Sequence, residues 1–161
     1  MDGNNLTKGK SMNCSKYFFL LILIPLIIAC GKKEAAPEGA APSDPMADKG
    51  IGPVSSVTLG PIDAQKAEQG GDLFKAKCSG CHKIQEKYVG PALIGVTKRQ
   101  SPEWIMNMIL NPQEMTQKNA TARELLATHY TQMTFQNVTQ DEVRSILEFF
   151  RQNDARSTID Y

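Results

Sequence analysis

Three residues near the middle of the chain have the types and the spacing that covalent and metal chemistry require. Cys78, Cys81 and His82 belong to the sequence Cys-Ser-Gly-Cys-His. Two thiols at this spacing can reach the two vinyl groups of one porphyrin and form thioether bonds, and the adjacent imidazole can then bind the iron. The pattern predicts one covalently bound haem c with His82 as its proximal ligand.

Other uses of these residues fit the sequence less well. A structural zinc site needs four ligands, and Cys78, Cys81, His82 and His129 supply that number, but two adjacent ligands strain a tetrahedral arrangement. A thioredoxin-like dithiol needs βαβ strands, and the chain has no pattern that predicts them. Covalent haem also helps to complete the core of a domain of roughly ninety residues, because a large apolar macrocycle adds buried surface.

The charge of the chain argues against a nucleic-acid-binding protein. Its 161 residues include 18 basic and 17 acidic side chains, a formal net charge of +1. A nucleic-acid binder would carry a clustered excess of lysine and arginine. Residues 1–29 hold three of the lysines and one aspartate, so the rest of the chain has 15 basic and 16 acidic residues.

The first 29 residues predict a targeting segment. A basic start precedes the apolar run 17–29, whose 13 residues include Pro25. As a helix this run would reach about 20 Å, short of the roughly 30 Å hydrocarbon core, and the layout is typical of a secretory signal peptide. The run ends in Ile-Ile-Ala-Cys30 and resembles the lipobox of bacterial lipoproteins. That resemblance implies cleavage before Cys30 and its diacylation, which gives stable anchoring; the alternative is an uncleaved anchor.

The rest of the chain divides into a linker, a domain and a tail. Residues 30–61 are rich in alanine and proline and lack an apolar period, so they predict a flexible, lipid-anchored linker. Within it, residues 54–59 form a short β-like run that could lie against the domain. Residues 62–154 predict the folded domain, and residues 155–161 a C-terminal tail.

The sequence of this domain predicts an all-α fold of about four helices. The expected helices span residues 63–77, 101–110, 121–130 and 139–152. Asp63 and Ser101 are candidate N-caps. Thr121 and Thr139 each open a candidate capping box. Residues 83–100 contain glycine and proline without a helical pattern and predict a loop.

Residues 64–152 resemble a class I c-type cytochrome with one haem. The similar features are Gly70-x3-Phe74-x3-Cys78 before the haem motif, the sequence Val-Gly-Pro-Ala-Leu at 89–93, Asn111-Pro112, a following methionine, and a last helix with Phe149-Phe150. The resemblance implies a cytochrome c-like fold around one covalent haem. It also implies that Gly70 and Phe74 pack against Phe149 or Phe150 where the first and last helices cross.

The resemblance also assigns roles on the two sides of the haem. The carbonyl of Pro91 would accept a hydrogen bond from Nδ1 of the proximal histidine and orient its ring. Met133 would be the sixth iron ligand, which raises the reduction potential; the family usually has proline after this methionine, and here Thr134 follows. Met115 and His129 are the competing sixth ligands.

Together these inferences predict a membrane-tethered one-electron carrier that faces the periplasm or the cell exterior and is not an enzyme. Expected redox partners are a quinol-oxidising complex as donor and a terminal oxidase or periplasmic reductase as acceptor; resemblance to tethered cytochromes of this kind implies nitrous oxide reductase as one such acceptor. Four lysines flank the haem motif as a possible docking face or as ordinary surface charge: Lys75, Lys77, Lys83 and Lys87. The alternative is a haem-based gas sensor or small haem enzyme with an open or displaceable sixth position.

Overall fold

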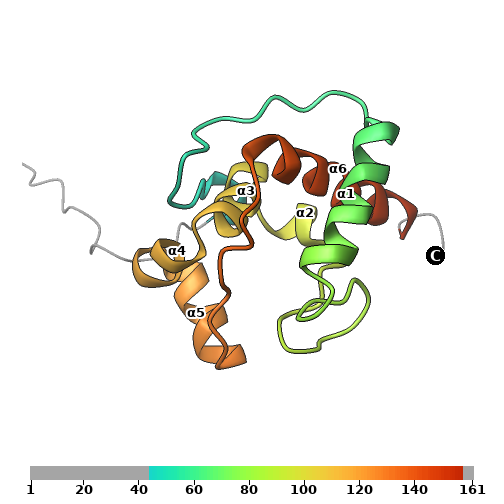
Figure 1. Ribbon diagram of the computed structural model, residues 1–161. Coiled ribbons are helices and arrows are strands. Elements are labelled where there is room, and N and C mark those ends of the chain that lie inside the picture. The colour runs from blue at the N-terminus through green and yellow to red at the C-terminus, as the bar shows by residue number, and fades with distance from the viewer. Residues whose placement is uncertain (1–43, 158–161) are drawn as a thin grey trace, which may run out of the picture. The chain divides into compact units, whose positions relative to one another are not determined.

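The computed structural model describes residues 44–157, and this part of the chain is helical and contains no strand (Figure 1). Its elements are the 3-10 turn η1 (Pro45–Ala47) and the helices α1 (Ala64–Lys77), α2 (Val96–Arg99), α3 (Pro102–Leu110), α4 (Pro112–Lys118), α5 (Ala120–His129) and α6 (Gln140–Arg156). The all-α prediction is confirmed. The predicted signal segment and the anchoring Cys30 lie outside the described residues. None of the described helices is long and apolar enough to cross a membrane.

Three of the four predicted helices begin where their capping residues indicate. The side chain of Asp63 accepts a hydrogen bond from Lys66 N–H at the start of α1, and Ser101 accepts one from Trp104 N–H at the start of α3. Thr139 opens a complete capping box before α6. The predicted cap of α5 at Thr121 is wrong, because Asn119 caps this helix by accepting a hydrogen bond from Ala122 N–H.

Two short helices were not predicted, and one helix is longer than expected. α2 has four residues and follows Gly95, whose positive φ of 73° suits glycine. α4 begins at Pro112, the first helical position, where the missing N–H removes no helical hydrogen bond. α6 continues to Arg156 rather than stopping at residue 152, so the predicted tail begins inside this helix.

The crossing of α1 and α6 holds the domain together. A Cβ atom at Gly70 would lie 2.0 Å from the backbone oxygen of Ser145, so the two helices meet backbone to backbone at this point. One turn later, the ring of Phe74 packs 5.4 Å from that of Phe149 and 5.9 Å from that of Phe150, between centroids. These contacts confirm the crossing that the family resemblance implied.

Residues 48–63, here called the N-terminal strap, cross the top of the molecule in Figure 1 before they enter α1. The strap has no partner strand in the described chain, and buried side chains of α3 form hydrogen bonds with its backbone instead. The Asn107 carboxamide accepts a hydrogen bond from Val54 N–H at 2.9 Å and donates to the carbonyls of Val54 and Lys49. Glu103 accepts one from Val57 N–H at 2.9 Å. The backbone groups of this extended segment therefore find partners without a sheet.

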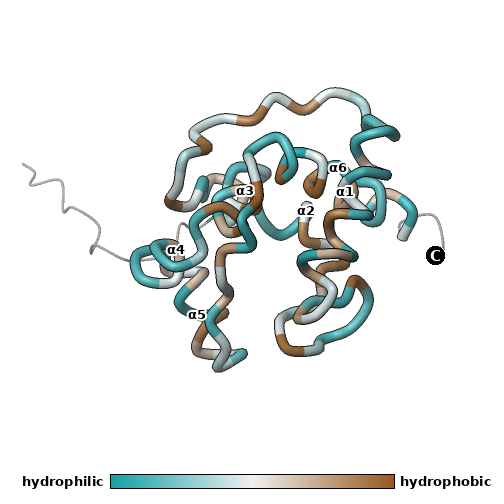
Figure 2. Tube along the Cα trace, in the orientation of Figure 1, coloured by the Kyte–Doolittle hydropathy of each residue, from teal (hydrophilic) through white to brown (hydrophobic). Residues whose placement is uncertain are grey.

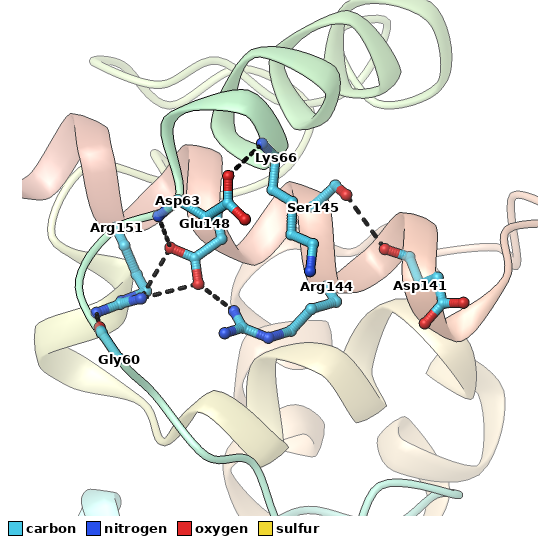
Figure 3. Close-up of polar contacts among 8 residues, drawn as sticks. All are labelled: Gly60, Asp63, Lys66, Asp141, Arg144, Ser145, Glu148 and Arg151. Carbon is cyan, nitrogen blue, oxygen red and sulfur yellow. Dashed lines mark hydrogen bonds and ion pairs between the residues drawn. The ribbon is translucent and has the colours of Figure 1, made fainter.

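A buried carboxylate ties the end of the strap to α6 (Figure 3). The Glu148 side chain is fully buried and forms ion pairs with Arg144 and Arg151, which come from the same helix. Glu148 also accepts a hydrogen bond from Asp63 N–H at 3.4 Å, and Arg151 donates to the Gly60 carbonyl at 2.8 Å. Two arginines and a backbone donor thus compensate for the burial of one negative charge.

These contacts correct the linker boundary that the composition predicted. Residues 48–61 were assigned to the flexible linker, within which the run 54–59 was the part expected to contact the domain. That contact is present, because Val54 is buried and packs in the hydrophobic core, but the segment that contacts the helices begins well before it. Figure 2 shows hydrophobic positions spaced along this segment rather than a uniformly polar one. Composition alone misassigned the segment because its partners are polar side chains of α3 and α6, more than 40 positions away in sequence.

Candidate functional site

The cysteine–histidine motif forms a tight turn at the end of α1. Cys78 caps this helix, and its N–H donates to the carbonyl of Phe74. The N–H groups of Cys81 and His82 both donate to the carbonyl of Cys78, at 3.0 and 2.9 Å. The turn places the two thiols and the imidazole on one short segment. The end of α1 fixes where this segment begins.

A loop spanning residues 83–95 folds back onto this turn. Gly90 N–H donates to the carbonyl of Cys81 at 2.9 Å, and Ile94 N–H donates to the carbonyl of Ile84 at 2.7 Å. The far end of the loop is fixed by Asp154 of α6, whose carboxylate accepts hydrogen bonds from the N–H groups of Gly95 and Thr97. The predicted loop is therefore held at both ends.

The loop positions the ring of His82. Nδ1 of His82 lies 3.3 Å from the carbonyl oxygen of Pro91, which can accept its proton. A Cβ atom at Gly90 would lie 2.4 Å from Cε1 of the ring, so only glycine leaves room for the imidazole in this orientation. Because Pro91 occupies Nδ1, the nitrogen left for a metal is Nε2.

Burial sets the protonation of this site. The pKa of His82 is lowered, mainly because burial disfavours the imidazolium; the hydrogen bond to Pro91 opposes this shift, and the nearby His129 adds to it. A lowered pKa favours the neutral ring, the form that binds iron. Burial raises the pKa of the Cys78 thiol, an effect that Lys77 partly offsets.

The two cysteines differ in exposure, and neither forms a disulfide. Cys78 is half-buried and packs against the hydrophobic core, whereas Cys81 is exposed. Between residues 44 and 157, no three His, Cys, Asp or Glu side chains are grouped so that they could hold a metal ion. The four candidate zinc ligands therefore do not gather into one site in the described chain.

Met133, the expected sixth ligand, lies in the loop between α5 and α6. Its side chain is partly buried and packs against the hydrophobic core. The loop is tied to its surroundings through side chains: Gln132 accepts a hydrogen bond from Thr116 and donates to the Met133 carbonyl, and Lys77 of α1 donates to the Gln136 carbonyl at 3.4 Å. The last bond links this loop to the helix that carries the motif.

The two competing sixth ligands occupy different surroundings. Met115 is fully buried under the strap, and its sulfur lies 2.9 Å from the N of Ile51, whose N–H it accepts. His129 ends α5, and its buried Nδ1 has no hydrogen-bond partner in the described structure. The sulfur of Met115 thus accepts a hydrogen bond from the strap. His129 interacts electrostatically with His82 and lowers the pKa of His82.

Comparisons with known proteins agree with this site. The family model described as Cytochrome c matches residues 67–154, more than half of the chain. The chain belongs to the cytochrome c family. Membership implies one covalent haem c, and Cys78 and Cys81 fit the attachment motif of the family.

Solved structures of this family resemble the whole domain. A cytochrome c from Rhodothermus marinus is 43% identical, covers 70% of this chain and 99% of its own, and superposes with a TM-score of 0.67. An engineered form of that protein, bound to a carbene intermediate, is 42% identical over 65% of this chain and 91% of its own, with a TM-score of 0.61.

A curated relative resembles a shorter part of the domain. A cytochrome c-553-like protein of Synechocystis is 37% identical over 62 residues, which cover 30% of this chain. The chain spans 59% of the length of this relative.

The residues of the site fit a covalent haem. The motif offers two uncommitted thiols, and the neighbouring imidazole has its Nδ1 occupied and its Nε2 left to coordinate. Partly buried apolar side chains pack against the core from the loop after the motif, from α5 and from the loop after α5: Ile84, Leu93, Leu125 and Met133. Such half-buried apolar groups are the surroundings that a porphyrin ring requires.

Some functional contacts escaped the sequence analysis. Gly90 was noted only as part of a loop sequence, although its missing side chain sets the space for His82. Its position directly before Pro91 was the available signal. Trp104 belongs to the core: it is buried, and its indole N–H donates to Asn119 at 3.2 Å.

Proposed function

We propose that the protein is a membrane-tethered one-electron carrier with a single haem c, His82 and Met133 as axial iron ligands, and acylated Cys30 as the anchor. The observation that carries this proposal is the fixed His82 ring. It stands beside two free thiols, is oriented by Pro91 and leaves one nitrogen for iron. Family membership supports the same function.

The bound haem would supply reversible one-electron exchange at its iron. The chain would keep the iron surroundings constant during this exchange. Pro91 and Gly90 hold the proximal ring in one orientation, and the thioether bonds at Cys78 and Cys81 would fix the macrocycle against α1. Met133 would fill the sixth position from the opposite loop and favour the ferrous state.

Aromatic side chains surround the region where a redox partner would dock. Tyr88 belongs to the loop after the motif, and Tyr130 and Phe135 belong to the loop that carries Met133; all three are exposed. Lys83 lies over the Tyr88 ring, 5.1 Å from its centroid. A small apolar rim with scattered cations suits brief, weak docking of the kind that electron-transfer partners use.

The proposed location follows from the sequence of the N-terminal segment. A signal segment that ends at an acylated Cys30 would place the domain on a bacterial membrane, facing the periplasm or the cell exterior. A quinol-oxidising complex would be the electron donor. A terminal oxidase or a periplasmic reductase, such as nitrous oxide reductase, would be the acceptor.

Visible spectra of the haem-loaded protein test the electron-carrier proposal. We expect sharp low-spin bands on reduction, a weak near-infrared methionine-to-iron band on oxidation, and no reaction of the reduced protein with carbon monoxide. Met133→Ala should abolish the near-infrared band, and Met115→Ala, a matched methionine variant, should retain it. Ready binding of carbon monoxide by the unmutated protein would favour the gas-sensor or enzyme alternative. Absence of covalent haem would contradict the proposal.

Mass spectrometry of the N-terminal peptide tests the anchor. We expect cleavage before Cys30 and a mass increase equal to a diacylglyceryl group, with or without a further acyl chain on the new N-terminus. Replacing residues 1–30 with a cleavable secretory leader that leaves no acylated cysteine should release the protein from the membrane fraction without changing its visible spectrum. An uncleaved N-terminus with an unmodified Cys30 would contradict the lipoprotein part of the proposal and leave the electron-carrier part standing.

A further inference from the structure

A second apolar region lies away from the haem motif. Of the six exposed large hydrophobic side chains in the described chain, Tyr88, Tyr130 and Phe135 belong to the loops of the haem site. The other three, Met46, Leu59 and Ile62, all line one open pocket of about 310 Å³. The exposed apolar surface of the domain is thus divided between two places.

The pocket is formed by the strap, its preceding turn and the helices beneath them. Met46 comes from η1, while Leu59 and Ile62 come from the other end of the strap. The floor includes Ile105 of α3 and Leu147 of α6. In Figure 1 the strap runs along the top of the molecule, whereas the loop 83–95 and the end of α5 lie at the bottom. Leu59 and Ile62 precede the start of α1, whereas the haem motif follows its end, so this side of the pocket and the motif lie at opposite ends of α1.

The charged side chains that line the pocket have partners within the domain. Lys98 and Arg151 line it together with Asp154. The Asp154 side chain is nearly fully buried and accepts hydrogen bonds from the N–H groups of Gly95 and Thr97 and from the Thr97 hydroxyl. Arg151 is paired with Glu148, and its side chain is only 17% exposed. The pocket therefore presents a mainly apolar surface, of the kind that lies at the boundary between lipid headgroups and acyl chains.

The position of the proposed anchor at Cys30 indicates that a lipid bilayer covers the pocket. Only 14 positions separate Cys30 from Asp44, which caps η1 at the edge of the pocket. A coil of this length spans about 20 Å, and even fully extended it reaches about 50 Å. A bilayer that holds Cys30 is therefore always within reach of Met46. A tether this short raises the effective concentration of the surface to the mM range, so a weak contact suffices.

We propose that Met46, Leu59, Ile62 and the pocket between them form a membrane-docking surface that lies on the bilayer anchored by Cys30. This docking would direct the haem motif away from the lipid, toward soluble or membrane-bound redox partners. The inference rests on the proposed acylation of Cys30, and it adds an orientation to the proposed electron carrier.

Vesicle binding of the acyl-free protein tests the surface itself. Haem-loaded protein that begins at residue 31, exported behind a cleavable leader that leaves no acylated cysteine, would be sedimented with vesicles of phosphatidylethanolamine and phosphatidylglycerol at mM lipid, and bound protein read from haem absorbance. Met46→Ser with Leu59→Ser and Ile62→Ser should lower the bound fraction about fivefold or more. Tyr88→Ser with Tyr130→Ser is the matched control and should change it less than about twofold, although Tyr130 is 89% exposed. An equal loss in both variants, or no sedimentation of the parent protein, would overturn the proposal.

Hydrogen–deuterium exchange of the acylated haem protein in the same vesicles tests the orientation. Peptides covering residues 44–63 should exchange more slowly than in the acyl-free protein without vesicles, while peptides covering 83–95 should be unchanged. Protection of 83–95 instead, or a concentration-dependent dimer that protects 44–63 without lipid, would overturn the proposal. Failure of the underlying function is seen separately, as an unmodified Cys30 or as carbon monoxide binding.

Discussion

The haem-motif turn with its loop, residues 78–95, and the N-terminal strap solve the same problem in different ways. Both segments lack regular structure and must satisfy their backbone groups. The motif region does so mainly through its own backbone, as in the bond from Gly90 to Cys81. The strap relies on buried side chains of distant helices, chiefly Asn107 and Glu148. Apart from the Asp154 contact that fixes Gly95 at the end of the loop, the region built for a ligand is thus organised by local contacts, whereas the strap is organised by long-range ones.

This difference predicts how each region responds to mutation. Changes in the strap contacts should lower the free energy of unfolding and leave the haem spectrum unaltered. Changes beside His82 should alter the spectrum and the reduction potential at small cost in stability. A change at the crossing of α1 and α6, which supports both regions, should affect both.

The largest effect is expected for Gly70→Ala. The new Cβ would lie 2.0 Å from the backbone oxygen of Ser145, so the helices must separate. We expect a loss of about 3 kcal/mol or more in the free energy of unfolding, measured by denaturant titration of the haem protein. Gly60→Ala is the control, because a Cβ there meets no atom within 4 Å. Equal stability of the two variants would show that the crossing can relax.

A smaller loss is expected for Glu148→Gln. This variant leaves Arg144 and Arg151 without their carboxylate, and their side chains are only 24% and 17% exposed. The cost should be about 2 kcal/mol, below that of a fully buried pair because of this partial exposure. Glu114→Gln removes an exposed partner of Lys118 and should leave the stability nearly unchanged, because solvent screens the pair. A changed haem spectrum in Glu148→Gln would contradict the separation of the two regions.

Gly90→Ala probes the motif region alone. A Cβ 2.4 Å from Cε1 of His82 must displace the ring and weaken its hydrogen bond to Pro91. We expect a shift of the reduction potential on the order of tens of millivolts, read by spectroelectrochemistry, with little change in unfolding. Asn107→Ala is the counterpart in the strap contacts and should lower stability while the potential stays constant. The reverse pattern would refute the comparison.

The smallest effect concerns the junction where the Met133 loop enters α6. The pKa of Glu142 lies below its usual value of 4.5, chiefly because the Thr139 N–H donates to its carboxylate. A carboxyl group whose pKa is lower in the folded than in the unfolded protein stabilises the fold. This stabilisation is complete when the pH is above the pKa of the unfolded state, and it is lost as the pH falls through the pKa of the folded state. The unmutated protein should therefore have a higher free energy of unfolding than Glu142→Gln at neutral pH. This difference should shrink below about pH 4.5 in denaturant titrations. A difference independent of pH would contradict this origin.

The sequence carried most of the information about the local parts of the molecule. The caps at Asp63, Ser101 and Thr139 mark helix starts because a capping side chain acts within three residues of itself. The haem motif is equally local. The crossing at Gly70 was accessible only through the family resemblance, since its contact with Ser145 spans the whole domain.

The strap illustrates what local reasoning misses. Its composition resembles a linker, and its partners Glu103, Asn107 and Glu148 look like ordinary surface residues of helices. Glu148 offered one signal, because arginines stand four residues before and three residues after it on the same helical side. The roles assigned to Met133 and Cys30 remain predictions.

The fixed start of the strap also determines how the domain carries mechanical load. A pull on the chain before Asp44 first meets Asp48, whose carbonyl accepts a hydrogen bond from Ser101 and whose carboxylate accepts one from Asn119. These partners begin α3 and cap α5, so tension passes into the far half of the helical core. The cysteines follow α1, which comes after the remaining strap contacts along the chain, so the force would reach them only after those contacts break.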